Sequence, residues 1–152
     1  MRKLRVYADT SVFGGCFDPE FEAESRKLFE EVRQGRFTVV ISDVTVEELQ
    51  PAPEEVRQVL AKLPPEHVEL VEGSDETEAL RQAYLEAGIV GIVSSNDAAH
   101  IAAATTAEVD IVVSWNFKHI VHFEKIAGYE GVNTLRGFRS PRIYSPKQVV
   151  EL

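Results

Sequence analysis

Short apolar runs alternate along this chain with amphipathic segments, and that alternation restricts the fold more than any other feature of the sequence. Runs rich in β-branched and aromatic residues predict strands at residues 4–8, 37–41, 68–71, 109–114 and 142–144. The spacing of apolar residues between them predicts helices at residues 19–34, 44–50, 54–62, 75–87 and about 97–107. Because strands that alternate with helices pair in parallel, we predict an α/β protein with a three-layer α/β/α fold and a mainly parallel central sheet.

Two glycine-containing segments are predicted to be irregular. Residues 12–17 include Gly14 and Gly15, a composition typical of a flexible connection. A helix is predicted at residues 119–127, and the chain from Gly128 to the last strand is predicted to be looser, with a final turn from Pro146. Because no linker, repeat or low-complexity tract interrupts the pattern, residues 1–152 are expected to form a single domain.

The composition is that of an ordinary globular protein, with 44% hydrophobic and 27% charged residues. No apolar run approaches the roughly 18 residues that a membrane helix needs, and the first residues lack the pattern of a signal segment. Cys16 is the only cysteine, which excludes an internal disulfide and a cysteine metal cluster. We therefore expect a cytoplasmic location and no membrane partner.

The charge is unevenly distributed. The net charge of −9 argues against broad, unspecific adhesion to nucleic acid. Residues 1–115 carry 22 acidic and 10 basic side chains, whereas residues 116–152 carry 3 acidic and 6 basic ones. The basic C-terminal part could contact phosphates or an acidic partner, or it could be an ordinary solvated surface, and the sequence leaves both open.

Polar side chains follow two of the most strand-like segments, where each segment ends. Asp9 comes directly after the first strand, with Thr10 and Ser11 able to orient it, and Asn116 follows the strand at 109–114. Open α/β sheets bind ligands beyond the carboxyl ends of their strands, so these positions are candidate site residues. The alternative for Asp9 is that an Asp-Thr-Ser cluster simply caps the next turn.

Two more acids are expected at the same edge of the sheet. Glu48 lies on the helix after the second strand, and Asp97 opens the alanine-rich helix. Like charges packed together are costly unless a cation neutralises them, and hard divalent cations such as Mg²⁺ take oxygen ligands. No histidine or cysteine spacing indicates zinc. Asp97 could instead be an acid that the helix dipole favours in a first turn.

The order of four motifs resembles the PIN-domain family, and most closely its toxin-like (VapC-type) members from type II toxin–antitoxin pairs. The motifs are Asp9-Thr10-Ser11, Ile41-Ser42 followed by Glu48-Leu49, Asp97-Ala98-Ala99-His100-Ile101-Ala102, and Ser114-Trp115-Asn116-Phe117-Lys118-His119. Each motif is weak by itself, but together they cover nearly the whole chain in the right order.

The resemblance implies a metal-dependent endoribonuclease. Asp9, Glu48 and Asp97 match the three acids that bind Mg²⁺ or Mn²⁺ in that family. The fourth family position is usually aspartate, and this chain has Asn116, which adds no charge and could ligate the metal or hold a metal-bound water. That departure puts a second metal in question. The resemblance also implies an RNA substrate, a small antitoxin partner and a homodimer.

Several neighbouring residues have both a functional and a structural interpretation. Glu47 and Glu48 lie about 100° apart on a helix, so only one can face the site, and the family pattern selects Glu48. Ser11 could support Asp9, and His100 could orient the site or touch substrate, or be a packed helix histidine. Lys118 and His119 could contact a phosphate or cap the next helix. Asp110 precedes a strand, so we expect it at the opposite end of the sheet in a structural role.

Two other classes of function are compatible with parts of the sequence. A PIN-like fold weakened by Asn116 could serve as an RNA- or protein-binding module without catalysis. A phosphotransfer domain could use Asp9 as phosphoryl acceptor, but haloacid-dehalogenase-type enzymes need a second aspartate two residues later, where this chain has Ser11. A receiver domain needs an acidic pair that we cannot place.

Overall fold

The computed structural model describes residues 2–152 and contains a five-stranded sheet whose order is β3-β2-β1-β4-β5. The strands are β1 (Leu4–Ala8), β2 (Phe37–Ser42), β3 (Val68–Val71), β4 (Ile111–Val113) and β5 (Arg142–Tyr144). All four neighbouring pairs run parallel, which confirms the predicted α/β class with a parallel central sheet.

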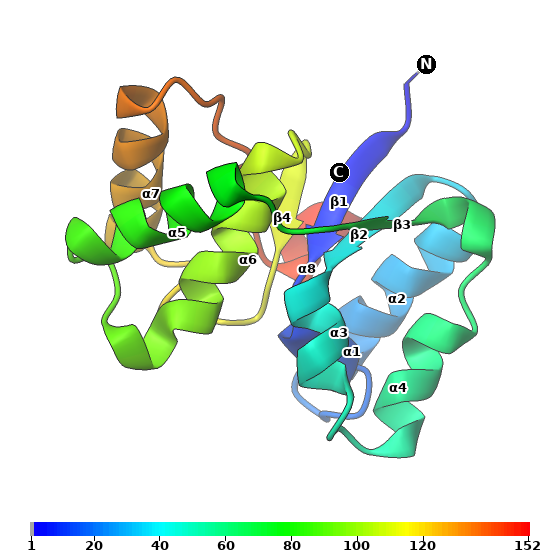
Figure 1. Ribbon diagram of the computed structural model, residues 1–152. Helices are drawn as coiled ribbons and strands as arrows, with labels where there is room; N and C mark the ends of the chain where they lie inside the picture. Colours follow the sequence, from blue (N-terminus) through cyan, green and yellow to red (C-terminus); the bar gives the residue numbers. More distant parts are fainter. Residues whose placement is uncertain (1) are drawn as a thin grey trace.

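Helices follow the strands in the alternation that the sequence predicted (Figure 1). Their bounds are α1 (Thr10–Gly15), α2 (Glu22–Arg33), α3 (Asp43–Leu49), α4 (Glu54–Ala61), α5 (Asp75–Glu86), α6 (Ser95–Thr106), α7 (Phe123–Leu135) and α8 (Pro146–Val150). Two short 3₁₀ turns, Pro65–His67 and Ile92–Ser94, precede β3 and α6. None of the helices within residues 2–152 has the length and apolar character that a membrane span requires.

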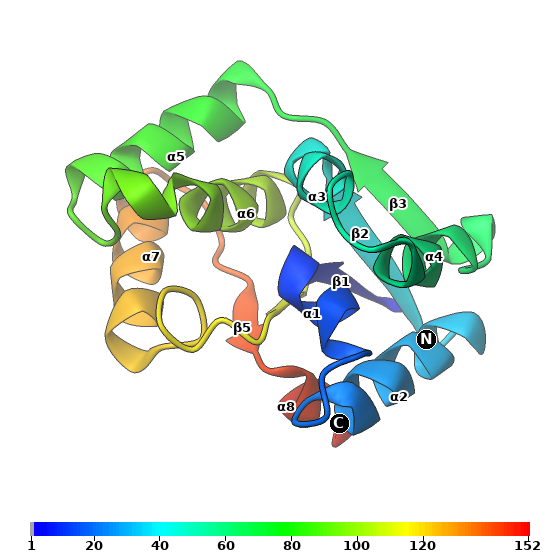
Figure 2. The same ribbon diagram turned by 90° about the horizontal axis from the view of Figure 1, so that it is seen from below.

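The sheet is covered on both faces because successive strand residues point to opposite sides. Val6 and Ala8 pack with α1, α2, α4 and α8 in one apolar cluster. Tyr7 lies between them in sequence and packs with α5, α6 and α7 in a second cluster on the other face. Figures 1 and 2 show these two helix layers on either side of the strands, which completes the three-layer arrangement.

The strand order places a switch in chain direction at the centre of the sheet. From β1 the chain moves outward to β2 and β3, and then crosses to β4 and β5 on the other side of β1. The loops that leave β1 and β4 therefore diverge, and the crevice between them is where open α/β sheets bind ligands. Asp9 occupies this position after β1, and its backbone N–H donates to Val113 at the end of β4 at 3.3 Å.

The prediction of a flexible connection at residues 12–17 was wrong, because residues 10–15 form α1. Glycines usually weaken helices, but Gly15 meets a packing requirement here. A Cβ atom at Gly15 would lie 2.5 Å from Ser25 Oγ and 2.7 Å from Trp115 Nε1. The glycine lets α1 lie against the side chain of Trp115.

The predicted helix at residues 119–127 is present, but its bounds and the loose segment predicted after it were wrong. Helix α7 begins at Phe123, continues through Gly128 and Gly131, and ends before Gly137, whose φ is +81°. A Cβ atom at Gly128 would lie 3.0 to 3.3 Å from the Ile89 side chain, so the glycine permits close packing against the segment that follows α5. Tertiary packing has outweighed the low helix propensity of glycine.

Candidate active site

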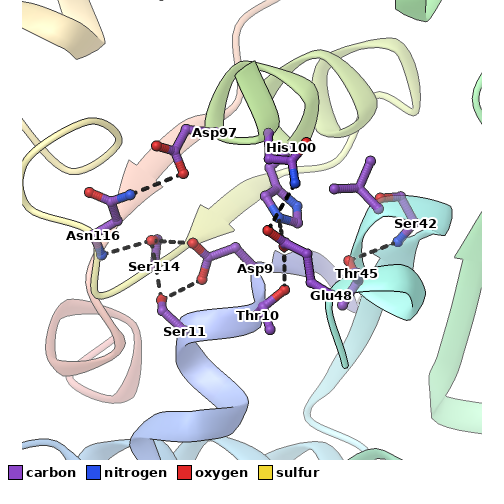
Figure 3. Close-up of polar contacts among 12 residues, drawn as sticks. Asp9, Thr10, Ser11, Ser42, Thr45, Glu48, Asp97, His100, Ser114 and Asn116 are labelled. Carbon is purple, nitrogen blue, oxygen red and sulfur yellow. Dashed lines mark hydrogen bonds and ion pairs between the residues drawn. The ribbon is translucent and has the colours of Figure 1, made fainter. Parts of the chain in front are cut away.

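Three acidic side chains, Asp9, Glu48 and Asp97, face a common space at the carboxyl ends of β1 and β4 (Figure 3). We call them the carboxylate cluster. Asp9 follows β1, Glu48 lies on α3, and Asp97 lies in the first turn of α6. The side chains are close enough for Asp9 and Glu48 each to disfavour ionisation of Asp97 by charge repulsion. The structure thus brings together the three acids that the sequence singled out.

Asp9 is held by two hydroxyl groups. It is 4% exposed, and Ser11 Oγ donates to its Oδ1 while Ser114 Oγ donates to its Oδ2, each at 2.6 Å. Ser11 Oγ also accepts the backbone N–H of Trp115 at 3.0 Å. Burial raises the pKa of the Asp9 carboxyl, although nearby His100 and the two hydrogen bonds oppose that shift. Ser11 therefore orients Asp9, as the sequence suggested.

Glu48 rather than Glu47 faces the cluster, since Glu47 is exposed. Oε1 of Glu48 accepts Thr10 Oγ1 and lies against His100 Nε2, both at 2.6 Å. Asn96 Nδ2 donates to Oε2 over a longer 3.3 Å. Partial burial opposes ionisation of Glu48, but the hydrogen bonds from His100 and Thr10 outweigh it and lower its pKa to about 2. Glu48 is therefore a carboxylate at neutral pH.

Asn116 joins the cluster through Asp97. Its Nδ2 donates to Asp97 Oδ1 at 3.1 Å, and its Oδ1 accepts the backbone N–H groups of Lys118 at 3.2 Å and His119 at 2.9 Å. Those two backbone donors fix which end of the amide is oxygen. Because the amide oxygen caps the following turn, Asn116 acts here as a donor that positions Asp97. It is not placed to offer that oxygen to a metal.

The remaining candidates lie around the cluster with different exposure. His100 is 2% exposed and contacts Glu48 through its ring. His119 is half-buried beside Asp97; burial raises the pKa of the Asp97 carboxyl, and the nearby His119 and His100 oppose that shift. Lys118 is exposed next to Asn116. His119 and Lys118 thus lie on the turn that borders the carboxylates.

No lysine or arginine neutralises the cluster. Among residues 2–152, the only ion pair made by Asp9, Glu48 or Asp97 is the contact between Glu48 and His100. Buried carboxylates without a cationic partner are costly, since each loses its hydration. The arrangement therefore favours binding of a cation from solution.

The donor set fits a hard divalent ion, because all three acids offer carboxylate oxygens. The arrangement of the three acids, however, is not that of a formed metal site. In the described part of the chain, no three His, Cys, Asp or Glu side chains are arranged so that they could hold a metal ion as they stand. Each carboxylate is instead engaged by hydroxyl, amide or imidazole groups. Metal binding would require some of these contacts to be exchanged.

Sequence reasoning missed four residues that shape the site: Tyr7, Thr10 as a partner of Glu48, Asn96 and Ser114. Thr10 was expected to help orient Asp9, yet it bonds to Glu48. A usable signal existed for Ser114, a hydroxyl at the end of a strand two residues before Asn116. Tyr7 gave a weaker signal, because a tyrosine in a buried strand needs a partner for its hydroxyl.

Comparisons with known proteins agree with the α/β fold described above. The sequence profile of the PIN domain matches residues 6–120, well over half of the chain. The solved structure of FitAcB from Neisseria gonorrhoeae superposes with a TM-score of 0.60 at 12% identity, over 93% of this chain and 98% of that chain. No curated protein matches by sequence.

Two further solved structures share the fold. VapBC2 from Rickettsia felis, bound to a DNA fragment from its promoter, gives a TM-score of 0.57 at 15% identity, over 93% of this chain and 98% of that chain. DNA-bound VapBC from Salmonella typhimurium gives 0.55 at 18% identity, over 94% and 98%. At such identities these likenesses establish a common fold and nothing finer.

Proposed function

This chain belongs to the PIN domain family, and on that premise we propose that it is a Mg²⁺- or Mn²⁺-dependent endoribonuclease that acts as the toxin of a toxin–antitoxin pair. The observation that carries the proposal is the carboxylate cluster: three acids without a lysine or arginine partner at the switch point of a parallel sheet. Such a site attracts a cation, and the chemistry of a bound divalent ion with water suits phosphodiester hydrolysis.

The roles of the residues follow from their contacts. Asp9, Glu48 and Asp97 would hold the ion, which supplies a Lewis acid and an activated water when bound. Ser11 and Ser114 orient Asp9, and Asn116 holds Asp97 by its amide N–H. Lys118 and His119 lie on the adjoining turn, where they could contact an RNA phosphate and offset the repulsion from an acidic body.

The partner proposals rest on the solved structures with the same fold and on family resemblance. The solved structures with the same fold are named as paired complexes, VapBC and FitAcB, so we propose a small antitoxin protein as partner. We also propose a homodimer, on family resemblance alone. The DNA named in two of those structures is bound by those complexes, and it does not identify the substrate of this chain.

The decisive experiment is incubation of the full chain with mixed RNAs in Mn²⁺, Mg²⁺ or EDTA. We expect cleavage with either metal, none with EDTA, and none with Asp9→Asn or Asp97→Asn. Glu47→Gln is the matched control, because Glu47 is an exposed acid on the same helix as Glu48. Cleavage that persists in EDTA, or in Asp9→Asn at the wild-type rate, would contradict the proposal.

One observation favours a second candidate, a binding module without catalysis. The carboxylates do not surround a metal position as they stand, and the oxygen of Asn116 is already engaged. A binding module would retain RNA or a protein partner equally well with and without Mn²⁺ and would show no cleavage product. A short gene for an antitoxin-like protein beside this one would favour the toxin.

A further inference from the structure

We propose that Tyr7 and His100 form a buried hydrogen-bond relay that fixes Glu48, so that one carboxylate oxygen is held by the protein and the other is left for a cation. The relay crosses three elements. The hydroxyl of Tyr7, on β1, lies 2.6 Å from His100 Nδ1 on α6, and His100 Nε2 lies 2.6 Å from Glu48 Oε1 on α3. Tyr7 and His100 are 0% and 2% exposed.

The donor in each hydrogen bond of the relay can be worked out from the carboxylate of Glu48, where the relay ends. His100 Nε2 lies 2.6 Å from Glu48 Oε1, and a carboxylate oxygen can only accept, so Nε2 carries the proton of that contact. In a neutral ring Nδ1 is then bare and accepts from the Tyr7 hydroxyl. The buried Tyr7 hydroxyl is the donor in this contact. The Tyr7 oxygen can in turn accept from Ser42 Oγ, which lies 2.7 Å away at the start of α3.

The relay distinguishes the two oxygens of Glu48. Oε1 receives both short hydrogen bonds, from His100 and from Thr10, at 2.6 Å each. Oε2 receives only the longer bond from Asn96 at 3.3 Å. Asn96 is exposed, so its amide can rotate into solvent with little loss. Oε2 is therefore the oxygen that a divalent ion would take, and His100 is a positioning residue that acts through Glu48.

This inference deepens the proposed function and rests on it for the identity of the ligand, but the relay itself can be tested without RNA. The proton on each ring nitrogen of His100 is observed directly by ¹⁵N NMR of the full chain. We expect the Nε2–H tautomer in the wild type. An Nδ1–H tautomer, or an even mixture, would overturn the relay, because Nε2 would then face a carboxylate oxygen without a proton.

The consequence for the site is tested by Mn²⁺ titration calorimetry on four variants. Tyr7→Phe removes only the relay hydroxyl, and His100→Leu removes the donor to Glu48. We expect each to weaken Mn²⁺ binding by about tenfold or more, as loss of a hydrogen bond behind a metal ligand does. His100→Gln keeps an amide donor and should recover part of that loss. Tyr84→Phe is the matched control, because Tyr84 is an equally buried tyrosine whose hydroxyl bonds to Asn133, away from the cluster.

The outcomes separate the relay from a general loss of stability. A relay predicts weaker Mn²⁺ binding in Tyr7→Phe than in Tyr84→Phe when both variants lose similar thermal stability. Equal affinities in those two variants would overturn it, as would wild-type affinity in His100→Leu. If the tautomer and the Mn²⁺ results hold but no RNA is cleaved, the relay stands and the nuclease proposal fails. If RNA is cleaved but His100 is not the Nε2–H tautomer, the nuclease proposal stands and the relay fails.

Discussion

The acidic side chains at the two ends of the parallel sheet have different partners. At the amino end, Asp110 accepts the Arg2 guanidinium and the backbone N–H of Arg5 at 2.8 Å, and Arg5 forms an ion pair with Glu69. At the carboxyl end, Asp9 and Asp97 are held only by hydroxyl and amide groups. Within residues 2–152, the acids at the amino end thus pair with arginines, whereas the only ion pair of the carboxylate cluster is the contact between Glu48 and His100.

The pKa directions follow this difference. Burial opposes ionisation of Asp110, but the Arg2 and Arg5 hydrogen bonds outweigh it and lower its pKa. Burial raises the pKa values of Asp9 and Asp97, and their hydrogen bonds and nearby histidines do not compensate. This contrast supports the proposal that the carboxylate cluster binds a cation from solution. The comparison can be tested by changing one acid at a time.

The largest expected effect is on cleavage by Asp9→Asn and Asp97→Asn. We expect each to lower the metal-dependent rate by about 1,000-fold or more, since a metal ion supplies several kcal/mol of transition-state stabilisation. The metal-free protein should keep or gain thermal stability, because a buried charge is removed. Cleavage rates and melting temperatures measure the two effects. Asp110→Asn should cleave at the wild-type rate, and a similar loss in that variant would erase the distinction between the two ends.

The next effect concerns the choice between Glu47 and Glu48. We expect Glu48→Gln to lower the cleavage rate by about 100-fold, because a neutral amide binds a divalent ion weakly. Glu47→Gln should have no effect, since that side chain points to solvent. Rates measured at several Mn²⁺ concentrations show whether added metal partly restores Glu48→Gln. Loss of activity in Glu47→Gln instead would mean that α3 presents its other face to the site.

Asn116→Asp is expected to have a smaller effect with two opposite parts. A fourth carboxylate should tighten Mn²⁺ binding by about tenfold, more so at low salt. Without metal, the new carboxylate would replace a hydrogen bond to Asp97 with repulsion and cost about 1 kcal/mol of stability. Asn116→Ala, which adds no charge, is the control for calorimetry and melting. Unchanged Mn²⁺ affinity in Asn116→Asp would place this residue away from the metal.

The smallest effect is on the stability of Asp110→Asn, and it has a distinctive pH dependence. An amide oxygen can still accept the Arg5 N–H, but the hydrogen bonds from Arg5 and Arg2 lose the carboxylate charge, which should cost about 1 kcal/mol. Because the folded pKa of Asp110 is lowered, its contribution is present above the usual value of 3.8 and disappears as the pH falls through the folded pKa. The deficit of the variant, measured by denaturant unfolding at several pH values, should vanish in acid.

Asp9→Asn should show the reverse trend. A raised folded pKa means that ionised Asp9 costs stability once the pH rises above 3.8, and fully so above the folded pKa. The gain in stability from Asp9→Asn should therefore be absent near pH 3 and grow as the pH rises. Parallel pH trends for the Asp9 and Asp110 variants would contradict the comparison.

The sequence predicted most of the sheet because buried parallel strands have a strong local signature. Runs such as residues 37–41 are rich in β-branched residues, and a polar side chain directly after a strand marks the carboxyl edge. The family resemblance, which the PIN profile confirms, depended on those same positions. Residues close to the strand ends were therefore predictable.

Glycine and side-chain networks were not predictable, because both depend on distant neighbours. The roles of Gly15 and Gly128 are set by Trp115 and Ile89, which lie far away in sequence. The contact of Tyr7 with His100 joins residues 93 positions apart. No local pattern distinguishes such a tyrosine from an apolar core residue, so the groups behind the carboxylates became visible only in three dimensions.

The connectivity of the sheet also determines when the carboxylate cluster can assemble during synthesis of the chain. Strand β1 is made first, yet it pairs with β4, and Asp9 bonds to Ser114, which is 105 residues later in the chain. A nascent chain that has exposed Asp9, Glu48 and Asp97 still lacks the strand and the hydroxyl that hold Asp9 in place. Strand pairing across so long a stretch is slow, because the entropy of loop closure is lost before the contacts between the strands can form. The carboxylate cluster is therefore completed only after β4 and Ser114 have been synthesised and have paired with β1.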